Sequence, residues 1–116
     1  MGIVELENME FFARHGCFTE ERIIGNQFIV NLRMEVDIEK PMKSDNLEGA
    51  LNYQQAYLVV KGEMEQPSRL LEHVAGRIVD ALYKEFEQIK KITVKVSKMN
   101  PPVGGKVGSS SVTFTK

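Results

Sequence analysis

Hydrophobic and polar residues alternate one by one along the segment from Gln27 to Ile38. This period of two is typical of a β-strand that buries one face. The segment from Ile3 to Ala13 shows a less regular alternation and predicts a partner strand, with an expected bulge at Asn8-Met9. The apolar positions of the longer strand are Phe28, Val30, Leu32, Met34, Val36 and Ile38.

Two segments in the middle of the chain show helical spacing instead. Asn52 is expected to cap the first helix, with Gln55 completing a capping box. Pro67 breaks the chain before a second helix, which Ser68 is expected to cap and which should run to Ile89. The apolar stripes of the two helices are Ala56, Val59, Val60 and Met64, followed by Leu70, Leu71, Val74, Ile78, Ala81, Leu82 and Phe86.

Alternation returns in the segment Lys91–Ser97, and Val112 and Phe114 indicate a short final strand. The order strand, strand, helix, helix, strand, strand predicts one α+β domain over residues 1–116. Both helices should cover one face of a four-stranded antiparallel sheet. Such a sheet has open edges and an uncovered second face, which a small protein covers most simply by oligomerising. We therefore expect an assembly.

The composition narrows the class of protein. A net charge of −1 over 116 residues argues against non-specific binding to nucleic acid, which needs a strong basic field. No apolar run approaches the roughly 18 residues of a membrane span, and the acidic N-terminal segment lacks the basic start of a signal peptide. The one cysteine cannot form an internal disulfide. We therefore expect a cytoplasmic protein without membrane or nucleic-acid partners.

Candidate chemistry is concentrated in loops and at the ends of elements. Glu21 lies in the run HGCFTEER after the first strand, where solvation is the ordinary role of such charges. Tyr53, at the start of the first helix, could simply anchor that helix with its ring. Glu72 follows Leu71 in the first turn of the second helix, where the dipole and free N–H groups favour a carboxylate. An ionised carboxylate there could accept two parallel hydrogen bonds from a guanidine-like edge, such as N3–H and the 2-amino group of a pterin.

Lys98 stands where the third strand is expected to end and a rigid loop containing Pro101-Pro102 begins. Exposure to solvent is the ordinary state of a lysine. If the loop covers this one, its ammonium group would lose solvation and could serve as a base near neutral pH.

Other kinds of site are poorly supported. A catalytic zinc needs at least three good ligands, and the candidates reduce to His15, Cys17 and His73, without an i, i+4 pair. A nucleophilic dyad of His15 and Cys17 is disfavoured, because a cysteine beside a glycine more often packs as a small residue. The segment 104–111 lacks the spacing of a phosphate-binding loop and follows no strand-to-helix turn. We expect no metal and no cofactor.

Four separated stretches, taken in order, resemble the dihydroneopterin aldolase family. They are HGxxxEE from His15, the triplets DNL from Asp45 and LNY from Leu51, LLEHVA from Leu70, and KxNPPVGG from Lys98. The resemblance spans essentially the whole chain. It implies ββααββ subunits of the tunnelling fold that form rings around a tunnel. Two tetrameric rings commonly stack as an octamer, with the active sites at subunit interfaces.

The same resemblance implies roles for individual residues. Lys98 would be the general acid/base, and Glu21 would line the site near the substrate side chain. Glu72 would anchor the pterin ring beside the Leu71 backbone. Tyr53 would reach the site from a neighbouring subunit.

The implied function is that of a lyase of folate biosynthesis. It cleaves 7,8-dihydroneopterin by a retro-aldol step to 6-hydroxymethyl-7,8-dihydropterin and glycolaldehyde, with C2′ epimerisation as an expected side activity. The C6=N5 imine of the substrate accepts the electron pair, so neither a Schiff base nor a metal is needed and the protein supplies orientation and proton transfer. Two departures leave the fine shape of the site open: Gly49-Ala50 stands where a threonine or similar residue is frequent, and Lys116 where an arginine is common.

Three alternatives stay open at this level. An epimerase of dihydroneopterin or its triphosphate could share the fold, although a triphosphate would call for more clustered Lys and Arg. A non-catalytic pterin- or purine-binding subunit would keep Glu72 but need not retain Lys98 or Glu21. In a purely structural oligomeric sheet protein, the four stretches would be a coincidence. The joint presence of Glu72, Lys98 and Glu21 favours the enzyme.

Overall fold

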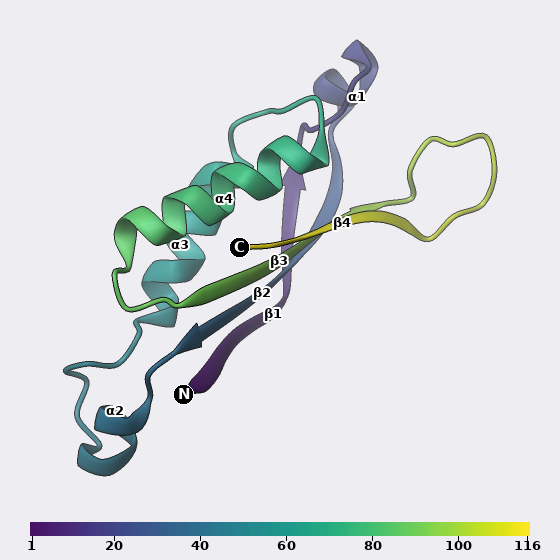
Figure 1. Ribbon diagram of the computed structural model, residues 1–116. Helices are drawn as coiled ribbons and strands as arrows, with labels where there is room; N and C mark the ends of the chain where they lie inside the picture. Colours follow the sequence, from purple (N-terminus) through teal and green to yellow (C-terminus); the bar gives the residue numbers. More distant parts are fainter.

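The computed structural model describes residues 1–116 as a four-stranded antiparallel sheet with two long helices on one face (Figure 1). The order of strands in the sheet is the order along the chain, β1-β2-β3-β4. The expected α+β architecture is therefore confirmed. The elements are β1 (Gly2–Ala13), α1 (Thr19–Ile24), β2 (Asn26–Val36), α2 (Glu39–Ser44), α3 (Tyr53–Met64), α4 (Leu71–Glu85), β3 (Lys91–Met99) and β4 (Ser109–Thr115).

The core lies between the sheet and helices α3 and α4. Alternate side chains of β2 and β3 point into it, because successive residues of a strand face opposite sides. Helix α4 packs its apolar stripe over them, and α3 buries Ala56, Val60 and Met64. The most completely buried large side chains of the core are Phe28, Leu32, Met34, Met64, Ile78, Leu82 and Ile92.

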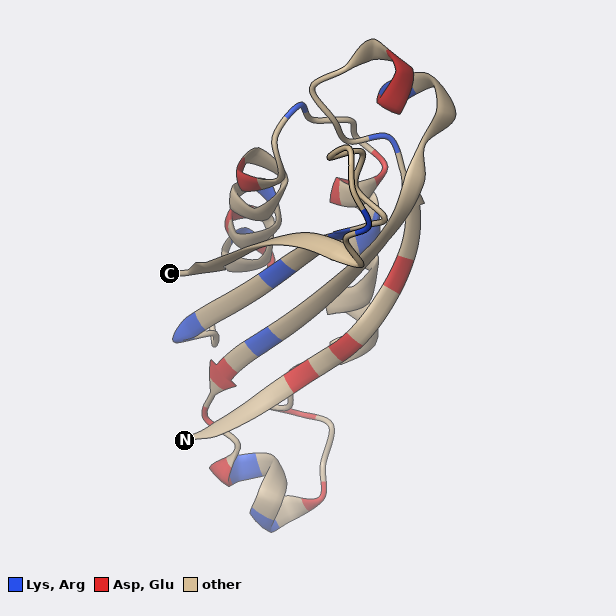
Figure 2. Ribbon diagram, turned by 90° about the vertical axis from the view of Figure 1, so that its right-hand side faces the viewer, with Lys and Arg blue, Asp and Glu red and all other residues tan.

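The other face of the sheet carries no helix. Acidic residues follow one another along β1, whereas β3 carries basic residues and β2 carries one of each sign, Arg33 and Glu35 (Figure 2). Glu5 lies opposite Arg33 in the β1–β2 register, and Glu35 lies opposite Lys91 in the β2–β3 register. The edge strands β1 and β4 each pair on one side only. The open edges and uncovered face expected from the sequence are thus present.

A bulge interrupts β1, as the sequence predicts. The register with β2 shifts between Leu6 and Met9, and Asn8 adopts a positive φ of 57°. Asparagine tolerates this left-handed conformation better than most residues. Its backbone N–H donates to Oδ1 of Asn31 on β2 at 2.8 Å, which satisfies a group that the broken ladder would leave unpaired. Beyond the bulge, Met9, Phe11 and Ala13 are buried on the helical side.

The helix starts were predicted with mixed success. Asn52 caps α3 as expected, because its side chain accepts from the backbone N–H groups of Gln54 and Gln55. The prediction that Ser68 caps the second helix is wrong: α4 begins at Leu71 without a side-chain cap. The Ser68 hydroxyl instead accepts from the Arg77 guanidinium and bonds His73 Nδ1, so tertiary partners outweighed its local preference.

The end of the second long helix and the two loops beside β2 also differ from expectation. Helix α4 ends at Glu85 and not at Ile89, which is buried in the connection to β3. The two loops expected around β2 contain the six-residue helices α1 and α2, which lie at opposite ends of the molecule (Figure 1). Neither short helix buries a residue, so neither has the apolar stripe that would have revealed it. No helix has the length and apolar character needed to cross a bilayer.

Candidate active site

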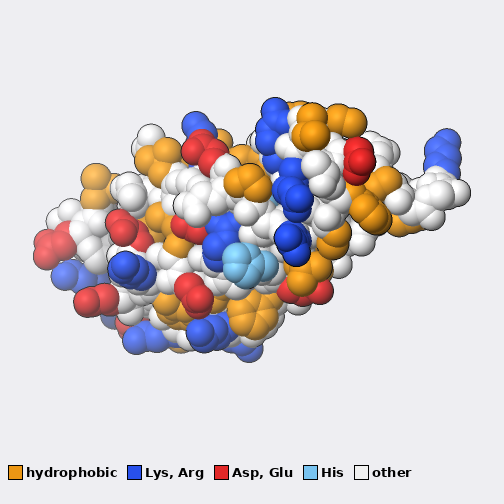
Figure 3. All heavy atoms as spheres, turned by 90° about the horizontal axis from the view of Figure 1, so that it is seen from above, with side chains coloured by type: hydrophobic (Ala, Val, Ile, Leu, Met, Phe, Trp, Pro, Cys, Tyr) orange, Lys and Arg blue, Asp and Glu red, His pale blue; other side chains and the backbone are white.

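A cavity of about 390 Å³ lies at the end of the molecule where β3 finishes and α4 begins. Figure 3 views the molecule from above, and acidic, basic and apolar side chains are interspersed over that face. The cavity contains three of the four polar side chains that the sequence singled out, together with Leu71. Its lining residues are Cys17, Phe18, Glu21, Arg69, Leu70, Leu71, Glu72, Lys98, Pro101, Pro102, Val103, Ser110 and Val112.

Lys98 reaches the cavity from the end of β3. It lies opposite Phe28 in the β2–β3 register and therefore projects from the helical face of the sheet. Its Nζ donates to Oε1 of Glu21 at 2.8 Å. The two side chains are only 13% and 17% exposed, so the pair is shielded from water much more than an ordinary surface ion pair.

Glu21 is held in place by its own loop. Its Oε2 accepts from the backbone N–H of Phe18 at 3.1 Å, while Oε1 takes the Lys98 ammonium. The carboxylate lies against Gly16, where an added Cβ would come within 2.4 Å of Oε2. A glycine at this position leaves the space that the carboxylate occupies.

The protonation state of Glu21 follows from these contacts. Burial pushes the pKa of the Glu21 carboxyl upward, but hydrogen bonds from Lys98 and the Phe18 amide, with nearby positive charge, outweigh it and hold that pKa below its ordinary value. Glu21 is therefore a carboxylate at neutral pH. It can accept a proton or orient a water molecule beside the lysine.

Glu72 and Leu71 occupy the first turn of α4, on the wall of the same cavity. Backbone N–H groups in a first turn have no acceptor within the helix. The Glu72 side chain is exposed and forms no ion pair. This turn therefore offers a free carboxylate and free amide donors side by side, which suits a ligand edge with adjacent donors and acceptors.

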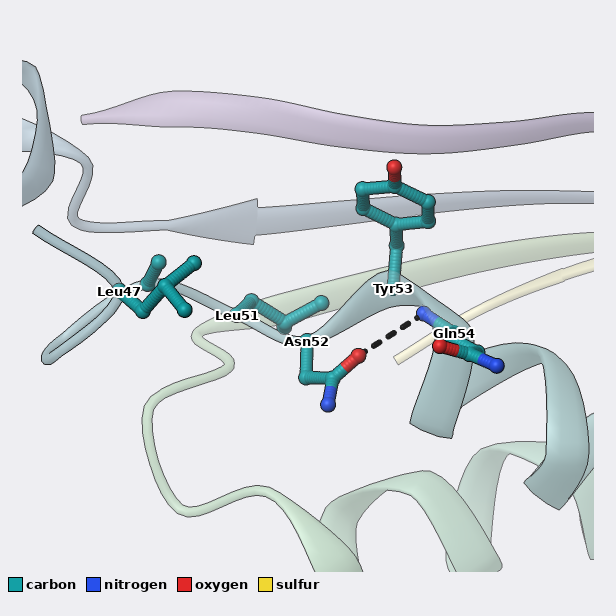
Figure 4. Close-up of a pocket in the computed structure, with 6 residues that line it drawn as sticks. Leu47, Leu51, Asn52, Tyr53 and Gln54 are labelled. Carbon is teal, nitrogen blue, oxygen red and sulfur yellow. Dashed lines mark hydrogen bonds between the residues drawn. The ribbon is translucent and has the colours of Figure 1, made fainter. Parts of the chain in front are cut away.

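Tyr53 is the exception, because it does not lie in this cavity. It is 63% exposed at the start of α3 and lines a separate hollow of about 400 Å³. In Figure 4 its ring projects away from Asn52 and Gln54, whose hydrogen bond marks the helix cap. Helix α3 has 12 residues and so is roughly 18 Å long. Tyr53 lies at the end of α3 remote from the turn that leads to Glu72.

The two departures from the family pattern fall outside the Lys98 cavity. Ala50 lines the hollow that contains Tyr53. Lys116 follows β4, and its ammonium lies 3.5 Å from Asp80 on α4. Neither residue lines the cavity that holds Glu21, Glu72 and Lys98.

Sequence reasoning missed a set of contacts between the segment before α1 and the segment before α4. His15 is buried, and its Nδ1 accepts from the backbone N–H of Ser68 at 3.1 Å. Cys17, expected to be a packing residue, is exposed and its Sγ donates to the Arg69 carbonyl at 3.4 Å. These partners are far apart in the sequence, and no local pattern indicates them. No three His, Cys, Asp or Glu side chains are placed to hold a metal ion.

Comparison with known proteins gives a consistent result. A family model described as dihydroneopterin aldolase matches residues 4–115. A dihydroneopterin aldolase of Bacillus subtilis is 38% identical over 117 residues, which span 100% of this chain and 98% of that protein. One from Staphylococcus epidermidis is 34% identical over 104 residues, which span 89% of this chain and 86% of that protein.

Solved structures show the same fold. The dihydroneopterin aldolase of E. coli, in complex with neopterin, has a TM-score of 0.92 at 24% identity and covers 100% of this chain and 99% of its own. A Burkholderia dihydroneopterin aldolase bound to guanine has a TM-score of 0.80 at 15% identity, over 99% of this chain and 89% of its own. From the family model and the sequence identity over its full length, this chain belongs to the dihydroneopterin aldolase family and is an enzyme of pterin cleavage in folate biosynthesis.

Proposed function

We propose that Lys98, Glu21 and Glu72 of one chain carry the retro-aldol cleavage of 7,8-dihydroneopterin, with Leu71 holding the ring and Tyr53 arriving from a neighbouring chain. The observation that carries this proposal is the shielded Lys98–Glu21 pair, 2.8 Å between Nζ and Oε1, in a cavity that Glu72 also lines. A proton-transfer pair and a ring-binding carboxylate face the same space, which is the arrangement that cleavage of a ring substituent requires.

Glu72 recognises the pterin ring in this proposal. Its carboxylate accepts from N3–H and the 2-amino group, and the Leu71 backbone contacts the same ring. The solved relatives support this assignment indirectly, since one is bound to neopterin and another to guanine. Both ligands carry a ring N–H beside a 2-amino group, N3–H in neopterin and N1–H in guanine, and a single carboxylate can accept from both donors in two parallel hydrogen bonds.

The reaction then needs two proton transfers. A base takes the proton of the 2′-hydroxyl, the C1′–C2′ bond breaks, and C2′ leaves as the aldehyde carbon of glycolaldehyde. The electron pair passes through C1′ into the C6=N5 imine, and protonation at C1′ completes the hydroxymethyl product. Lys98 and Glu21, working through a water molecule, move these protons, a contribution of about 10²–10⁴ in rate.

The protein functions as an assembly in this proposal, an octamer of two stacked tetramers. Two observations support it: the sheet has open edges, and Tyr53 lines a hollow that shares no residue with the Lys98 cavity. A second copy that brings its Tyr53 to the cavity would complete each site. The single cysteine is compatible with a cytoplasmic location.

The reverse step accounts for the expected side activity. If glycolaldehyde recombines with the bound ring through its other face, C2′ is inverted and the 2′-epimer is released. The reaction can be followed with 7,8-dihydroneopterin under anaerobic conditions in EDTA, with glycolaldehyde, hydroxymethyldihydropterin and epimer measured separately. Full activity in EDTA is expected, and loss of activity that added metal restores would contradict the metal-independent mechanism.

Mixing two variants tests the shared site directly. Lys98→Ala and Tyr53→Ala should each lose most activity alone. In assemblies formed from an equal mixture, a site between a Tyr53→Ala chain and a Lys98→Ala chain keeps both residues. Random mixing should therefore restore about a quarter of the wild-type rate, as expected for a heterologous interface. No recovery in assemblies shown to contain both chains would place the two residues in the same chain's site.

A further inference from the structure

His15 is the most deeply buried titratable side chain near the cavity, with 1% of its surface exposed. The Ser68 backbone N–H can only donate, so Nδ1 of His15 must accept and the ring proton must be on Nε2. That Nε2 is buried near the Met64 carbonyl and makes no hydrogen bond of good geometry. An apolar ring of similar shape would leave the buried Ser68 N–H without an acceptor, so packing alone does not explain a histidine at this position.

The contact to Ser68 is one of three that join the same two segments. Gly16 N–H donates to the Ser68 carbonyl at 3.0 Å, and Cys17 Sγ donates to the Arg69 carbonyl at 3.4 Å. The segment that contains His15 and Gly16 leads into α1, and the segment that contains Ser68 and Arg69 leads into α4. The three hydrogen bonds therefore fix the start of α1 relative to the start of α4.

Each segment carries part of the proposed site. Glu21 lies against Gly16, where an added Cβ would come within 2.4 Å of its carboxylate. Leu71 and Glu72 begin α4 three residues after the turn that His15 contacts. A shift of that turn away from His15 would move the proposed ring-binding carboxylate relative to Glu21.

His15 also contacts the sheet beneath Lys98. Its ring packs edge-on against Phe28, with 5.1 Å between the ring centroids. Phe28 lies directly opposite Lys98 in the β2–β3 register. The imidazole of His15, which belongs to the segment that leads into α1, thus contacts the turn before α4 and the β2 residue opposite Lys98.

We propose that His15 is a positioning residue, which sets the distance between the Lys98–Glu21 pair and the ring-binding start of α4 by accepting the Ser68 N–H. This inference rests on the site proposed above. His15 touches no substrate in it, and its effect is transmitted through Ser68. A small displacement of reacting groups can lower a rate by about 10²-fold, so the predicted effect is on turnover.

Two substitutions distinguish the effect of the hydrogen-bond acceptor on His15 from the effect of its ring shape. His15→Phe keeps a flat ring and removes the acceptor, whereas His15→Asn places an amide oxygen close to the position of Nδ1. We expect His15→Phe to fold with a Tm close to that of the wild type, because removing the poorly bonded Nε2 offsets leaving the Ser68 N–H without an acceptor. Its kcat for 7,8-dihydroneopterin should fall at least about tenfold with KM changed less than about threefold, and His15→Asn should recover most of the lost kcat.

A matched control lies on the open face. Ser97 is comparably buried and bonds the Ser111 hydroxyl at 2.7 Å, away from the cavity. Ser97→Ala should leave kcat unchanged. An unchanged kcat in His15→Phe, or equal losses in His15→Phe and His15→Asn, would overturn the inference. Wild-type rates in Lys98→Ala and Glu72→Gln would instead overturn the proposed site, and the inference with it.

The tautomer provides a readout that does not depend on any variant folding. Long-range ¹⁵N–¹H NMR of the wild-type protein should show His15 with an unprotonated Nδ1 and a protonated Nε2 at neutral pH. An Nδ1-protonated ring would contradict the Ser68 contact and overturn the inference.

Discussion

The Lys98 cavity and the hollow at Tyr53 differ in how much of their structure one chain supplies. At the Lys98 cavity, Lys98 pairs with Glu21 and His15 accepts from the Ser68 backbone, so the chain itself fixes the proposed proton-transfer groups. Around Tyr53 the side chains are mostly open, with Leu47 91% exposed and the tyrosine 63% exposed. If the chain assembles as proposed, one half of the site is preorganised within the chain, and the other half is the exposed Tyr53 end that a second copy would complete.

The most severe change to the preorganised half is loss of the lysine. Lys98→Ala should lower kcat about 10²–10⁴-fold, because it removes the proton-transfer group and leaves Glu21 without its cation. Glycolaldehyde release measures the effect. Lys95→Ala is the matched control, since Lys95 lies on the same strand but faces the open side of the sheet. Equal losses in both variants would point to damage of β3 and not to chemistry.

The second prediction concerns acid stability at the same end. Burial, then the charges of Arg77 and Lys98, lower the pKa of His15 from 6.5 to about 4, with the Met64 carbonyl acting weakly in the opposite direction. Between these pH values the unfolded chain binds a proton that the folded chain does not. The free energy of unfolding should therefore fall as pH drops from 6.5 to about 4, by about 3 kcal/mol.

Denaturant titrations across this pH range measure that loss, and His15→Phe should lack it. Glu21 acts in a lower window, because its depressed pKa gives stability that is present above its ordinary value of 4.5 and is lost as pH falls further. Identical pH profiles for the wild type and His15→Phe would show that His15 is protonated equally in the folded and unfolded chains.

The third prediction tests the space in which Glu21 lies. Gly16→Ala would place its Cβ within 2.4 Å of the Glu21 carboxylate and displace that side chain. We expect a loss of about tenfold in kcat, equivalent to about 1.4 kcal/mol. Gly62→Ala is the control: its added Cβ meets nothing within 4 Å, and an alanine inside α3 should stabilise the fold by about 0.8–1 kcal/mol. Equal activity in the two variants would refute the role given to Gly16.

The smallest effect is expected at the open half. Asn52→Ala removes the cap of α3, where Oδ1 accepts from the amides of Gln54 and Gln55 at 3.1 and 3.2 Å. The free energy of unfolding should fall by about 1 kcal/mol. Thermal unfolding measures it. A drop of several kcal/mol would mean that the Tyr53 end is more tightly integrated than its exposure indicates.

The fold was largely readable from the sequence because its main signals are local. The alternation in β2 and the helical stripe of α4 each follow from a face that must be buried. Lys98, at the end of a strand before a rigid loop, and Glu72, in a first helical turn, were only weak candidates from their positions, and the roles predicted for them came from the resemblance to the family.

What escaped prediction depends on contacts between distant residues. Ser68 has the local chemistry of a helix cap, but its hydroxyl forms hydrogen bonds with Arg77 and His73 instead. His15 and Ser68 are 53 positions apart, so no spacing rule connects them. The short helices α1 and α2 lack a buried face and therefore lack a pattern. Only the folded structure shows the hydrogen bonds that join the segment before α1 to the segment before α4.

The bulge at Asn8 has a consequence for the way β1 encodes its two faces. Val4 and Leu6 pack against the core before the bulge, and Met9 and Phe11 pack against it after the bulge. The core-facing residues of β1 therefore have even numbers before the bulge and odd numbers after it. The left-handed Asn8 accommodates the extra residue, so that both parts of β1 keep their pairing with β2. If Asn8 adopted an extended conformation, the apolar side chains on one side of the bulge would turn to solvent. The burial of His15 at the far end of this segment thus depends on a backbone conformation adopted by Asn8.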